Sequence, residues 1–354
     1  MAITRNQALE LFRSDDLIGL GMEADTLRQS LHPEGVVTYI LDRSIHYACF
    51  CSGYCSFCES SHCRSEAAQE GYVLDFDTIY AEIAEAEEMG GTGVSLRGGQ
   101  HADLKLEWFE RLLQGIRQRF PRIWLQCFSA PEILAIAKPA GLTIRDTISR
   151  LRDAGLDSIT GSAAEILDDD VRRVNGWQNC STEDWVSVHR SAHELGMRTA
   201  ATMIFGLGET FEQRINHFEL VRRLQETTGG FTAFIPGSFR PNSGSEKPTA
   251  GGNSDQATSI EYLKTLAISR LYLDNIENVQ SSGEAQGLKV LQLGLRFGGN
   301  DAGSALEESL AWGRNAVSSD RGQGSIEEEL RRVIRDAGFE PVQRDSLYTT
   351  CFLN

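Results

Sequence analysis

Five of the eight cysteines of this 354-residue chain lie close together, between Cys49 and Cys63. Three of them, Cys51, Cys55 and Cys58, have the spacing C-x3-C-x2-C and follow a β-branched apolar run. Thiolates are the usual protein ligands of iron–sulfur clusters, and three at this spacing can bind three corners of a [4Fe–4S] cube. The fourth iron would then lack a protein ligand and could bind a small molecule directly. We therefore predict an open iron–sulfur site on this segment.

The same segment also allows other metal sites. The last two cysteines of the motif form a pair at the spacing typical of structural zinc sites, which Cys49, Cys63 or His62 can complete. A four-cysteine cluster that uses Cys63 would only transfer electrons. Cys49 in place of Cys51 gives a second set of three cysteines, with the spacing C-x5-C-x2-C. A further interpretation is that these cysteines are buried unreactive thiols.

Strand-like and helix-like segments alternate along the chain after the N-terminal region. The strand-like runs lie at residues 36–42, 93–99, 123–129, 157–160, 198–207, 231–239 and 278–282. Such alternation indicates parallel βαβ units and no independent second domain. An open doubly wound sheet is the alternative, but Gly19-Leu20-Gly21, a weak nucleotide-binding signal, lies in a helical region with no strand before it. We expect an α/β fold, a TIM-type (β/α)8 barrel with an N-terminal helical extension.

The expected organisation places a helical extension at residues 1–35 and the barrel with a C-terminal cap at residues 36–354. Residues 5–32 have helical spacing and end at a Pro-Glu-Gly break. Residues 241–256 are rich in Gly, Ser, Pro and Asn and directly follow a predicted strand. They are interpreted either as a loop over the active-site side or as a tolerated surface insertion.

The charge balance argues against polyanionic partners. The chain has 34 Lys and Arg against 50 Asp and Glu, a net charge of −16, and a pI near 4.9. This excess of negative charge repels nucleic acid and anionic membranes, so neither is an expected partner. We find no signal-peptide pattern and no apolar run of the roughly 18 residues that a membrane span needs. We expect a cytoplasmic protein whose cysteines are thiols or metal ligands.

The cysteine motif, with Phe57 before its last cysteine, resembles the radical S-adenosylmethionine (SAM) superfamily. The resemblance implies two cofactors, a [4Fe–4S] cluster and S-adenosylmethionine, and an electron donor such as flavodoxin or ferredoxin. It implies that an electron from the cluster enters the sulfonium and releases a 5′-deoxyadenosyl radical, which removes hydrogen from a small-molecule substrate.

From about residue 38 to 349 the chain resembles one branch of that superfamily, the menaquinone and deazaflavin branch. The resemblance is carried by stretches such as GLDSITGSAAEILDDDVRR, HELGMRTAATMIFG, FTAFIP, LRFGGNDAGSALEE and PVQRDSLY. It is nearest to dehypoxanthine futalosine cyclase, which implies carbon–carbon bond formation or cyclisation of a nucleoside-like or aromatic substrate. A branch paralogue that adds the adenosyl radical to an alkene, as aminofutalosine synthase does, or that rearranges another substrate is the first alternative. A non-catalytic iron–sulfur or zinc protein is the second.

The resemblance also implies cofactor-binding residues. Phe57 would lie near the adenine, and Gly98 and Gly99 would offer backbone acceptors to the methionine amino group. Glycines let the main chain approach a ligand closely, although a strand-ending turn is the simpler interpretation. Glu132 and Glu165 are candidates to hold S-adenosylmethionine, with an acid in a helix's first turn as the alternative for each.

Three polar residues are candidates for the reaction itself. Arg97 can bind a substrate carboxylate through two parallel hydrogen bonds, or form an internal ion pair. His101 can donate to a substrate or transfer a proton near neutral pH, or be structural. Asp301, in the predicted last turn, can remove a proton after cyclisation or bind a hydroxyl, with an Asx turn as the alternative.

Four places at predicted strand ends differ from the pattern of the branch. Where the branch has Gln-Gly-Gly-x-His-Pro, this chain has Arg97-Gly-Gly-Gln-His101-Ala102. Leu207 stands where the branch has histidine, Gly237 where it has an aromatic residue, and Gly283-Glu284 where it has a pair that contains tryptophan. These changes exchange rings and a histidine for small, apolar or charged side chains. They predict a pocket of altered volume and polarity, as in a paralogue with a different substrate.

Overall fold

The computed structural model describes residues 2–48, 72–177, 179–239, 257–283, 286–305 and 324–352. The predicted metal ligands Cys51, Cys55 and Cys58 lie outside the described residues, as do Phe57, Glu284 and the stretch 241–256.

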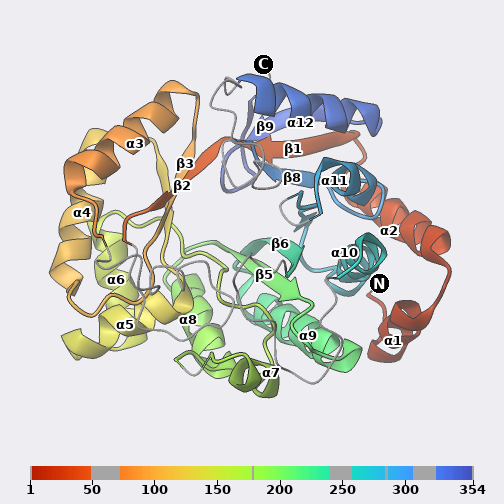
Figure 1. Cartoon of the computed structure of the whole chain (residues 1–354), viewed down its shortest axis with the longest axis horizontal. Helices are drawn as coiled ribbons and strands as arrows, with labels where there is room; N and C mark the ends of the chain where they lie inside the picture. Colours follow the sequence, from red (N-terminus) through yellow and green to blue (C-terminus); the bar gives the residue numbers. More distant parts are fainter. Residues whose placement is uncertain are drawn as a thin grey trace.

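The described strands alternate with helices as the sequence predicts (Figure 1). The strands are β1 (Val36–Ile40), β2 (Asp42–His46), β3 (Gly93–Arg97), β4 (Trp124–Cys127), β5 (Thr199–Phe205), β6 (Phe231–Ser238), β7 (Asn278–Val279), β8 (Asp301–Ser304), β9 (Glu340–Arg344) and β10 (Cys351–Phe352). The helices are α1 (Arg5–Arg13), α2 (Leu17–Leu31), α3 (Phe76–Glu88), α4 (Leu106–Arg119), α5 (Ala130–Ala140), α6 (Ile144–Ala154), α7 (Asp169–Val174), α8 (Thr182–Glu194), α9 (Phe211–Thr228), α10 (Ser259–Tyr272), α11 (Leu288–Gly294) and α12 (Gly324–Asp336).

Short polar side chains begin many of these helices. Thr4, Ser181 and Thr210 each accept a hydrogen bond from a backbone N–H of the first turn and complete a capping box with the third helical residue. Asp75 and Thr143 cap α3 and α6 in a simpler way, with one such bond each. These bonds satisfy N–H groups that have no partner within the helix, so the local sequence sets where the helices begin.

Almost all strand pairs are parallel, and in two of the three sheets the neighbouring strands follow the order of the chain. The sheets have the orders β10-β9-β1-β8, β2-β3-β4 and β5-β6-β7, and only β9 and β10 run antiparallel among the described strands. Leu41 alone separates β1 from β2, so one bent run joins the first two sheets. A bridge between Gln280 and Asp301 joins β7 to β8.

The predicted strand at residues 157–160 is present only as a single parallel bridge, from Ser158 to Gln126 of β4. Side chains connect it to β5 on its other edge. Ser158 Oγ donates to the Arg198 carbonyl at 2.6 Å, and Thr202 Oγ1 donates to the Gly161 carbonyl at 2.7 Å. The segment therefore lies between β4 and β5 although it forms no regular ladder with β5.

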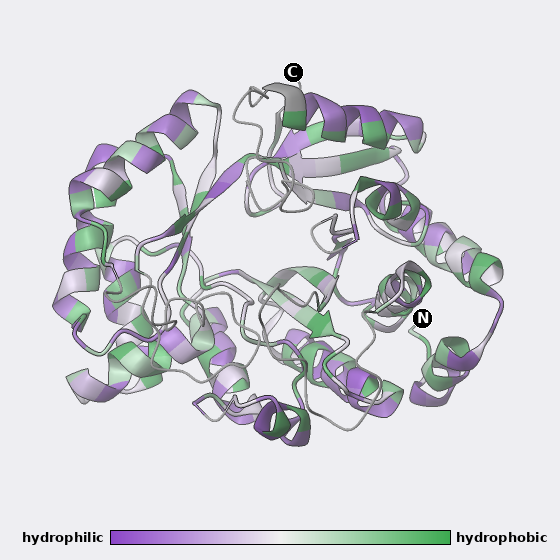
Figure 2. Cartoon of the chain, viewed as in Figure 1, coloured by the Kyte–Doolittle hydropathy of each residue, from purple (hydrophilic) through white to green (hydrophobic). Residues whose placement is uncertain are grey.

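The two faces of β5 and β6 have different surroundings. Ala201, Met203 and Phe205 are fully buried, and Phe205 stacks on Tyr262 of α10. Thr202 and Ile204, which alternate with them, are only half-buried. Side chains alternate across a strand, so the second set occupies the face away from α9 and α10. Figure 2 shows the matching amphipathic banding of the helices, which carry hydrophobic residues together with hydrophilic ones.

Residues 5–32 are helical as predicted, and the two helices pack against the later part of the chain. The Phe12 ring stacks on the Phe211 ring of α9 with centroids 4.8 Å apart. Lys264 of α10 donates to the Phe12 carbonyl at 3.3 Å. Within the described part of the chain, no helix combines the length and apolar character that crossing a membrane requires.

Candidate active site

The root of the cysteine-rich segment lies at the carboxyl end of β2. Ala48 and Val73 form an antiparallel bridge, and the Leu74 N–H donates to the Tyr47 carbonyl at 2.8 Å. The two ends of segment 49–71 are thereby held together, although its cysteines lie outside the described residues.

Gly98 and Gly99 form the turn that ends β3, and Glu132 of α5 binds both of them. Glu132 Oε1 accepts from the Gly98 N–H, the Gly99 N–H and the Tyr47 hydroxyl at 3.1, 3.1 and 3.2 Å. Its Oε2 accepts from the backbone N–H and the hydroxyl of Ser129, both at 2.7 Å. Five donors thus surround one carboxylate, which is only 6% exposed.

The glycine pair is required by the packing around it. A Cβ on Gly98 would lie 2.3 Å from the Tyr47 ring, and Gly99 has a φ of +69°. Trp108, at 5.6 Å between ring centroids, and Phe109, at 6.0 Å, hold the Tyr47 ring in place. A side chain at Gly98 is excluded by that clash, and the positive φ of Gly99 favours glycine.

Glu165 follows the bridge segment at residues 157–160, and β5 holds the backbone there. The Ile204 N–H donates to the Glu165 carbonyl at 3.0 Å, and Glu165 has the unusual φ of +35°. Its Oε2 is buried and has no hydrogen-bond partner among the described residues. Burial away from water raises the pKa of the Glu165 carboxyl to about 7, an effect that Arg172 partly offsets.

Arg172, a residue that sequence analysis missed, fixes the segment that carries Glu165. Its buried guanidinium donates to the carbonyls of Ala163, Ala164 and Cys180, at 2.7 to 3.2 Å. Asn179, beside Cys180, donates to the Gln100 side chain at 3.3 Å. Hydrogen bonds therefore connect the Glu165 segment to the turn after β3. An arginine on a short helix carried no signal for this role.

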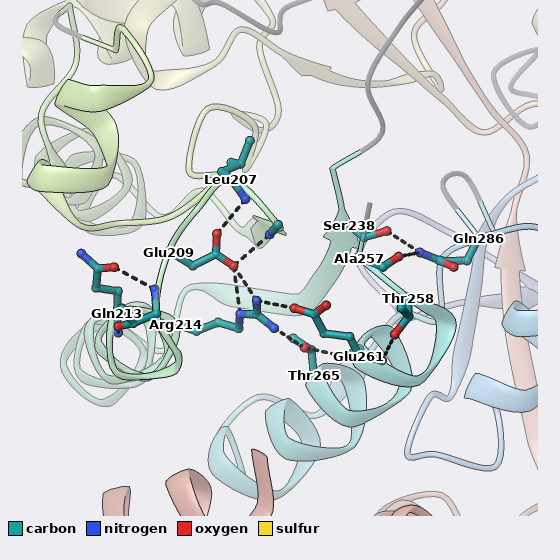
Figure 3. Close-up of polar contacts among 12 residues, drawn as sticks. Leu207, Glu209, Gln213, Arg214, Ser238, Ala257, Thr258, Glu261, Thr265 and Gln286 are labelled. Carbon is teal, nitrogen blue, oxygen red and sulfur yellow. Dashed lines mark hydrogen bonds and ion pairs between the residues drawn. The ribbon is translucent and has the colours of Figure 1, made fainter. Parts of the chain in front are cut away.

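Glu209 and Arg214, which sequence analysis also missed, organise the turn after β5 (Figure 3). The Gly206 and Leu207 N–H groups donate to the Glu209 carboxylate, both at 2.8 Å. Arg214 donates to Glu209 at 2.6 Å and to Glu261 of α10 at 2.7 Å. An acid directly after a strand-ending glycine was the available signal.

Two of the altered positions of the predicted substrate wall, Leu207 and Gly237, lie in or next to one apolar cluster. Leu207 is fully buried with Trp177 and Phe239, and Ile204 packs against them. A Cβ on Gly237, the register partner of Ile204, would lie 2.8 Å from Ile204 Cδ1. The Ile204 side chain thus occupies space next to Gly237 that a larger residue there would need.

Arg97 and His101 flank the glycine turn. Arg97 ends β3 with an exposed side chain. His101 is half-buried, and its Nδ1 accepts from the Asp103 N–H at 3.3 Å. This bond leaves Nε2 as the protonated nitrogen of a neutral ring. Both residues are thus close in the chain to the glycine turn that Glu132 binds.

Asp301 lies at the other end of the strands. It is the first residue of β8, not part of a turn after a strand, so that expectation was wrong. In the strand register Asp301 lies opposite Thr38 of β1, and Arg97 lies opposite His46 of β2. His46 follows Thr38 by eight residues, which is roughly 26 Å of extended strand, so Asp301 and Arg97 lie toward opposite ends of the strands. Asp301 forms a buried ion pair with Arg344 at 2.5 and 3.0 Å. Its predicted proton transfer stays a prediction.

Comparison with known proteins identifies the family. Residues 45–221 match the family model described as the radical SAM superfamily. The chain belongs to the radical SAM superfamily. Residues 228–352 of this radical SAM protein match a second model, described as the CofH/MqnC C-terminal region. The superfamily uses a [4Fe–4S] cluster and S-adenosylmethionine, and its members of this type are enzymes.

Relatives whose names indicate different activities are about equally similar to this radical SAM chain. Cyclic dehypoxanthine futalosine synthase of Halalkalibacterium halodurans is 36% identical, over 98% of this chain and 90% of its own. The 5-amino-6-(D-ribitylamino)uracil–L-tyrosine 4-hydroxyphenyl transferase of Methanothermobacter thermautotrophicus is 37% identical, over 98% and 94%. Aminodeoxyfutalosine synthase of Thermus thermophilus is 33% identical, over 96% and 90%.

The fold of this radical SAM protein is similar to that of a solved structure, methylornithine synthase. The TM-score is 0.71 at 19% identity, and the match covers 96% of this chain and 94% of the other. At that identity the likeness concerns the fold alone.

The described residues fit the cofactor of the superfamily. Gly99 donates its N–H to Glu132, so the Gly98 carbonyl of the same trans peptide points the opposite way. The Glu165 carboxylate has a buried oxygen without a donor among the described residues. Both groups are acceptors, and S-adenosylmethionine offers an ammonium group, ribose hydroxyls and a positive sulfonium.

Proposed function

We propose that this radical SAM enzyme forms a carbon–carbon bond by cyclising a nucleoside-like or aromatic small molecule, as the name of cyclic dehypoxanthine futalosine synthase indicates for that relative. The main support is the identity of 36% to that protein over 98% of the chain. When bound, the cluster and S-adenosylmethionine would supply a 5′-deoxyadenosyl radical that removes a hydrogen atom from the substrate.

The proposed architecture is a closed (β/α)8 barrel over residues 36–354, with residues 1–35 as a helical extension. It is supported by parallel pairs that follow chain order in two sheets, by β1 and β2 joining two sheets, by the pairing of β8 with β1, and by the bridge from β7 to β8. Active sites of such barrels lie at the carboxyl ends of the strands, where Arg97, Gly98 and Glu165 are found.

The proposed cofactor site combines described and undescribed residues. Cys51, Cys55 and Cys58 would hold the cluster, and Phe57 would lie against the adenine. The Gly98 carbonyl and the Glu165 carboxylate would accept hydrogen bonds from S-adenosylmethionine. An ionised Glu165 gains a cationic or donating partner on binding, which offsets its desolvation.

The proposed substrate site lies beside it. Arg97 would bind an anionic group of the substrate, and His101 would donate from Nε2. Ile204 and Gly237 provide an uncharged surface on the accessible face of β5 and β6. Nearby apolar side chains exclude water, which protects a reactive radical from side reactions.

A reductant completes the proposal. Flavodoxin or ferredoxin would donate the electron, and the reducing cytoplasm is the proposed location. That compartment also suits the two buried free thiols, Cys127 and Cys180.

A paralogue with a different substrate is the second candidate. Two observations support it: transferases and synthases are about equally similar to the chain, and the wall contains Leu207 and Gly237. Adenosyl-radical addition, as in aminofutalosine synthase, or a rearrangement would use the same cofactor site.

Anaerobic reconstitution tests the proposal. Protein loaded with iron and sulfide, reduced with dithionite, is incubated with S-adenosylmethionine and dehypoxanthine futalosine. We expect a [4Fe–4S] spectrum, 5′-deoxyadenosine and a cyclised product. Release of 5′-deoxyadenosine without turnover of that substrate would favour the paralogue, and absence of both cluster and cleavage would reject the enzyme.

Cysteine variants test the cluster ligands. Cys55→Ala should lose the cluster spectrum and 5′-deoxyadenosine formation, because only two ligands of the motif remain. Cys351→Ala removes an exposed thiol of β10 and should keep both signals. Cys55 belongs to both possible registers of the motif, so full activity of Cys55→Ala would reject both and point to another metal.

A further inference from the structure

We propose that Glu132 is a positioning residue: it orients and polarises the Gly98 carbonyl as an acceptor for a ligand ammonium group, and it does not touch the ligand. This inference rests on the proposed function, because the ligand is the amino-acid part of S-adenosylmethionine. It refines the expectation that Glu132 itself binds the cofactor.

The hydrogen bonds of Glu132 leave little capacity for a ligand. Oε1 accepts from Gly98, Gly99 and Tyr47, and Oε2 accepts twice from Ser129. A carboxylate has about four lone-pair sites, and five donors already use them. The side chain is also 6% exposed, so a ligand would reach it only by displacing these donors.

The two oxygens have different tasks. The bonds from Ser129 to Oε2 complete the capping box of α5 and need no other element. Oε1 instead reaches β3, more than thirty positions back in the chain, and holds the turn after it. A helix cap alone does not explain this second set of bonds.

The hydrogen bond from the Gly99 N–H to Glu132 determines which backbone acceptor the turn offers to a ligand. The Gly99 N–H and the Gly98 carbonyl belong to one planar trans peptide and point in opposite directions. A carboxylate on the N–H side polarises that peptide and strengthens the carbonyl as an acceptor on the other side. The carbonyl of the preceding peptide, at Arg97, already accepts from the Tyr47 N–H at 2.9 Å.

The charge of Glu132 acts in the same direction. Throughout the described residues its hydrogen-bond partners are neutral donors, namely three backbone N–H groups and two hydroxyls. A negative charge behind an acceptor carbonyl favours a cationic donor in front of it. An ammonium group combines positive charge with hydrogen-bond donors and therefore fits this place best.

Two ligands that differ in the amino-acid part test the inference. Binding of S-adenosylhomocysteine, which has the ammonium group, and of 5′-methylthioadenosine, which lacks it, is measured by calorimetry on the reconstituted protein. Glu132→Ala should weaken S-adenosylhomocysteine binding by roughly tenfold to a hundredfold, the range of a charge-assisted hydrogen bond, and change 5′-methylthioadenosine binding less than about threefold.

Two further variants separate positioning from folding. Glu132→Gln keeps an acceptor at Oε1 without the charge, so its loss should be smaller than that of Glu132→Ala. Ser129→Ala weakens only the helix cap and should leave both affinities within about threefold of the wild type.

If Glu132→Ala weakens the binding of both ligands equally, or weakens the binding of neither, the inference is overturned. If the wild-type protein binds neither ligand, the proposed function fails before Glu132 is tested.

Discussion

Glu165 shows how neighbouring residues can hold a single residue in an unfavourable state. Its backbone has a φ of +35°, and one carboxylate oxygen is buried without a partner in the described structure. Burial raises the pKa of its carboxyl to about 7. Strained residues of this kind persist only where neighbours hold them, here Arg172 and Ile204.

The pKa of Glu165 predicts a pH-dependent effect of Glu165→Gln. The pKa is raised in the folded state, so the folded protein loses stability as the pH rises from about 4.5 to about 7. The free energy of unfolding of Glu165→Gln, measured relative to that of the wild type, should therefore be about 2 kcal/mol higher at about pH 8.5 than at about pH 5.5.

Urea unfolding of unliganded protein at both pH values measures this gain. The amide introduced by Glu165→Gln cannot ionise, so the same difference between the two proteins at both pH values would contradict the raised pKa of Glu165.

At the scale of elements, close approaches of main chain decide how the strand ends fit together. A Cβ on Gly161 would lie 2.5 Å from the Ala200 carbonyl oxygen, which belongs to β5. A Cβ on Gly237 would lie 2.8 Å from the flexible end of the Ile204 side chain and at an ordinary contact distance of 3.8 Å from the Met203 carbonyl oxygen. Backbone cannot move aside as a side-chain terminus can, so the two glycines differ in importance.

Gly161→Ala and Gly237→Ala form a matched pair for this difference. Gly161→Ala should lower the free energy of unfolding by about 2 kcal/mol or more, because β5 would have to shift. Gly237→Ala should cost less than about 1 kcal/mol, because Ile204 can change rotamer. Urea unfolding measures both, and equal losses would show that the contact with Ala200 relaxes easily.

At the scale of the whole molecule, the last part of the chain closes back on the first strand. β9 pairs with β1, and Arg344 at its end forms the buried ion pair with Asp301 of β8. Thr38 of β1 also donates to Asp301, at 2.6 Å. The pair therefore ties three strands together, far along the strands from the predicted active site.

Asp301→Asn should destabilise the protein because Arg344 would remain buried without its counter-charge. We expect a loss of about 3 kcal/mol or more in the free energy of unfolding. The double variant Asp301→Asn with Arg344→Met should lose less than the sum of the single losses, since the two residues act as a pair. Unfolding in urea checks both values. Unchanged stability with loss of product would instead support Asp301 as the proton acceptor.

Much of the fold was predictable because its signals are local. Hydrophobic periodicity located the strands at 93–97, 199–205 and 231–238, and short polar residues such as Ser181 marked helix starts. Each signal involves residues within a few positions of one another, so the chain around it matters little. The cysteine spacing is also local, and the superfamily that it indicated is confirmed by the family match.

The roles of individual polar residues were not predictable in this way. Glu132 has the appearance of a helix cap in the sequence, yet its second oxygen binds a turn that ends β3. Asp301 was expected in a turn near the active site but begins β8 beside Arg344. Arg172 and Glu209 stood out little or not at all, although each holds a strand-end segment.

Element order and the cysteine motif therefore came from spacing along the chain, because short-range patterns encode them, and the superfamily came from the resemblance that this motif carries. Which carboxylate is buried without a hydrogen-bond partner among the described residues, which one holds a turn and which one is locked in an ion pair was decided only by tertiary packing. These roles depend on donors that are brought together from residues far apart in the chain, and no spacing within one segment records them.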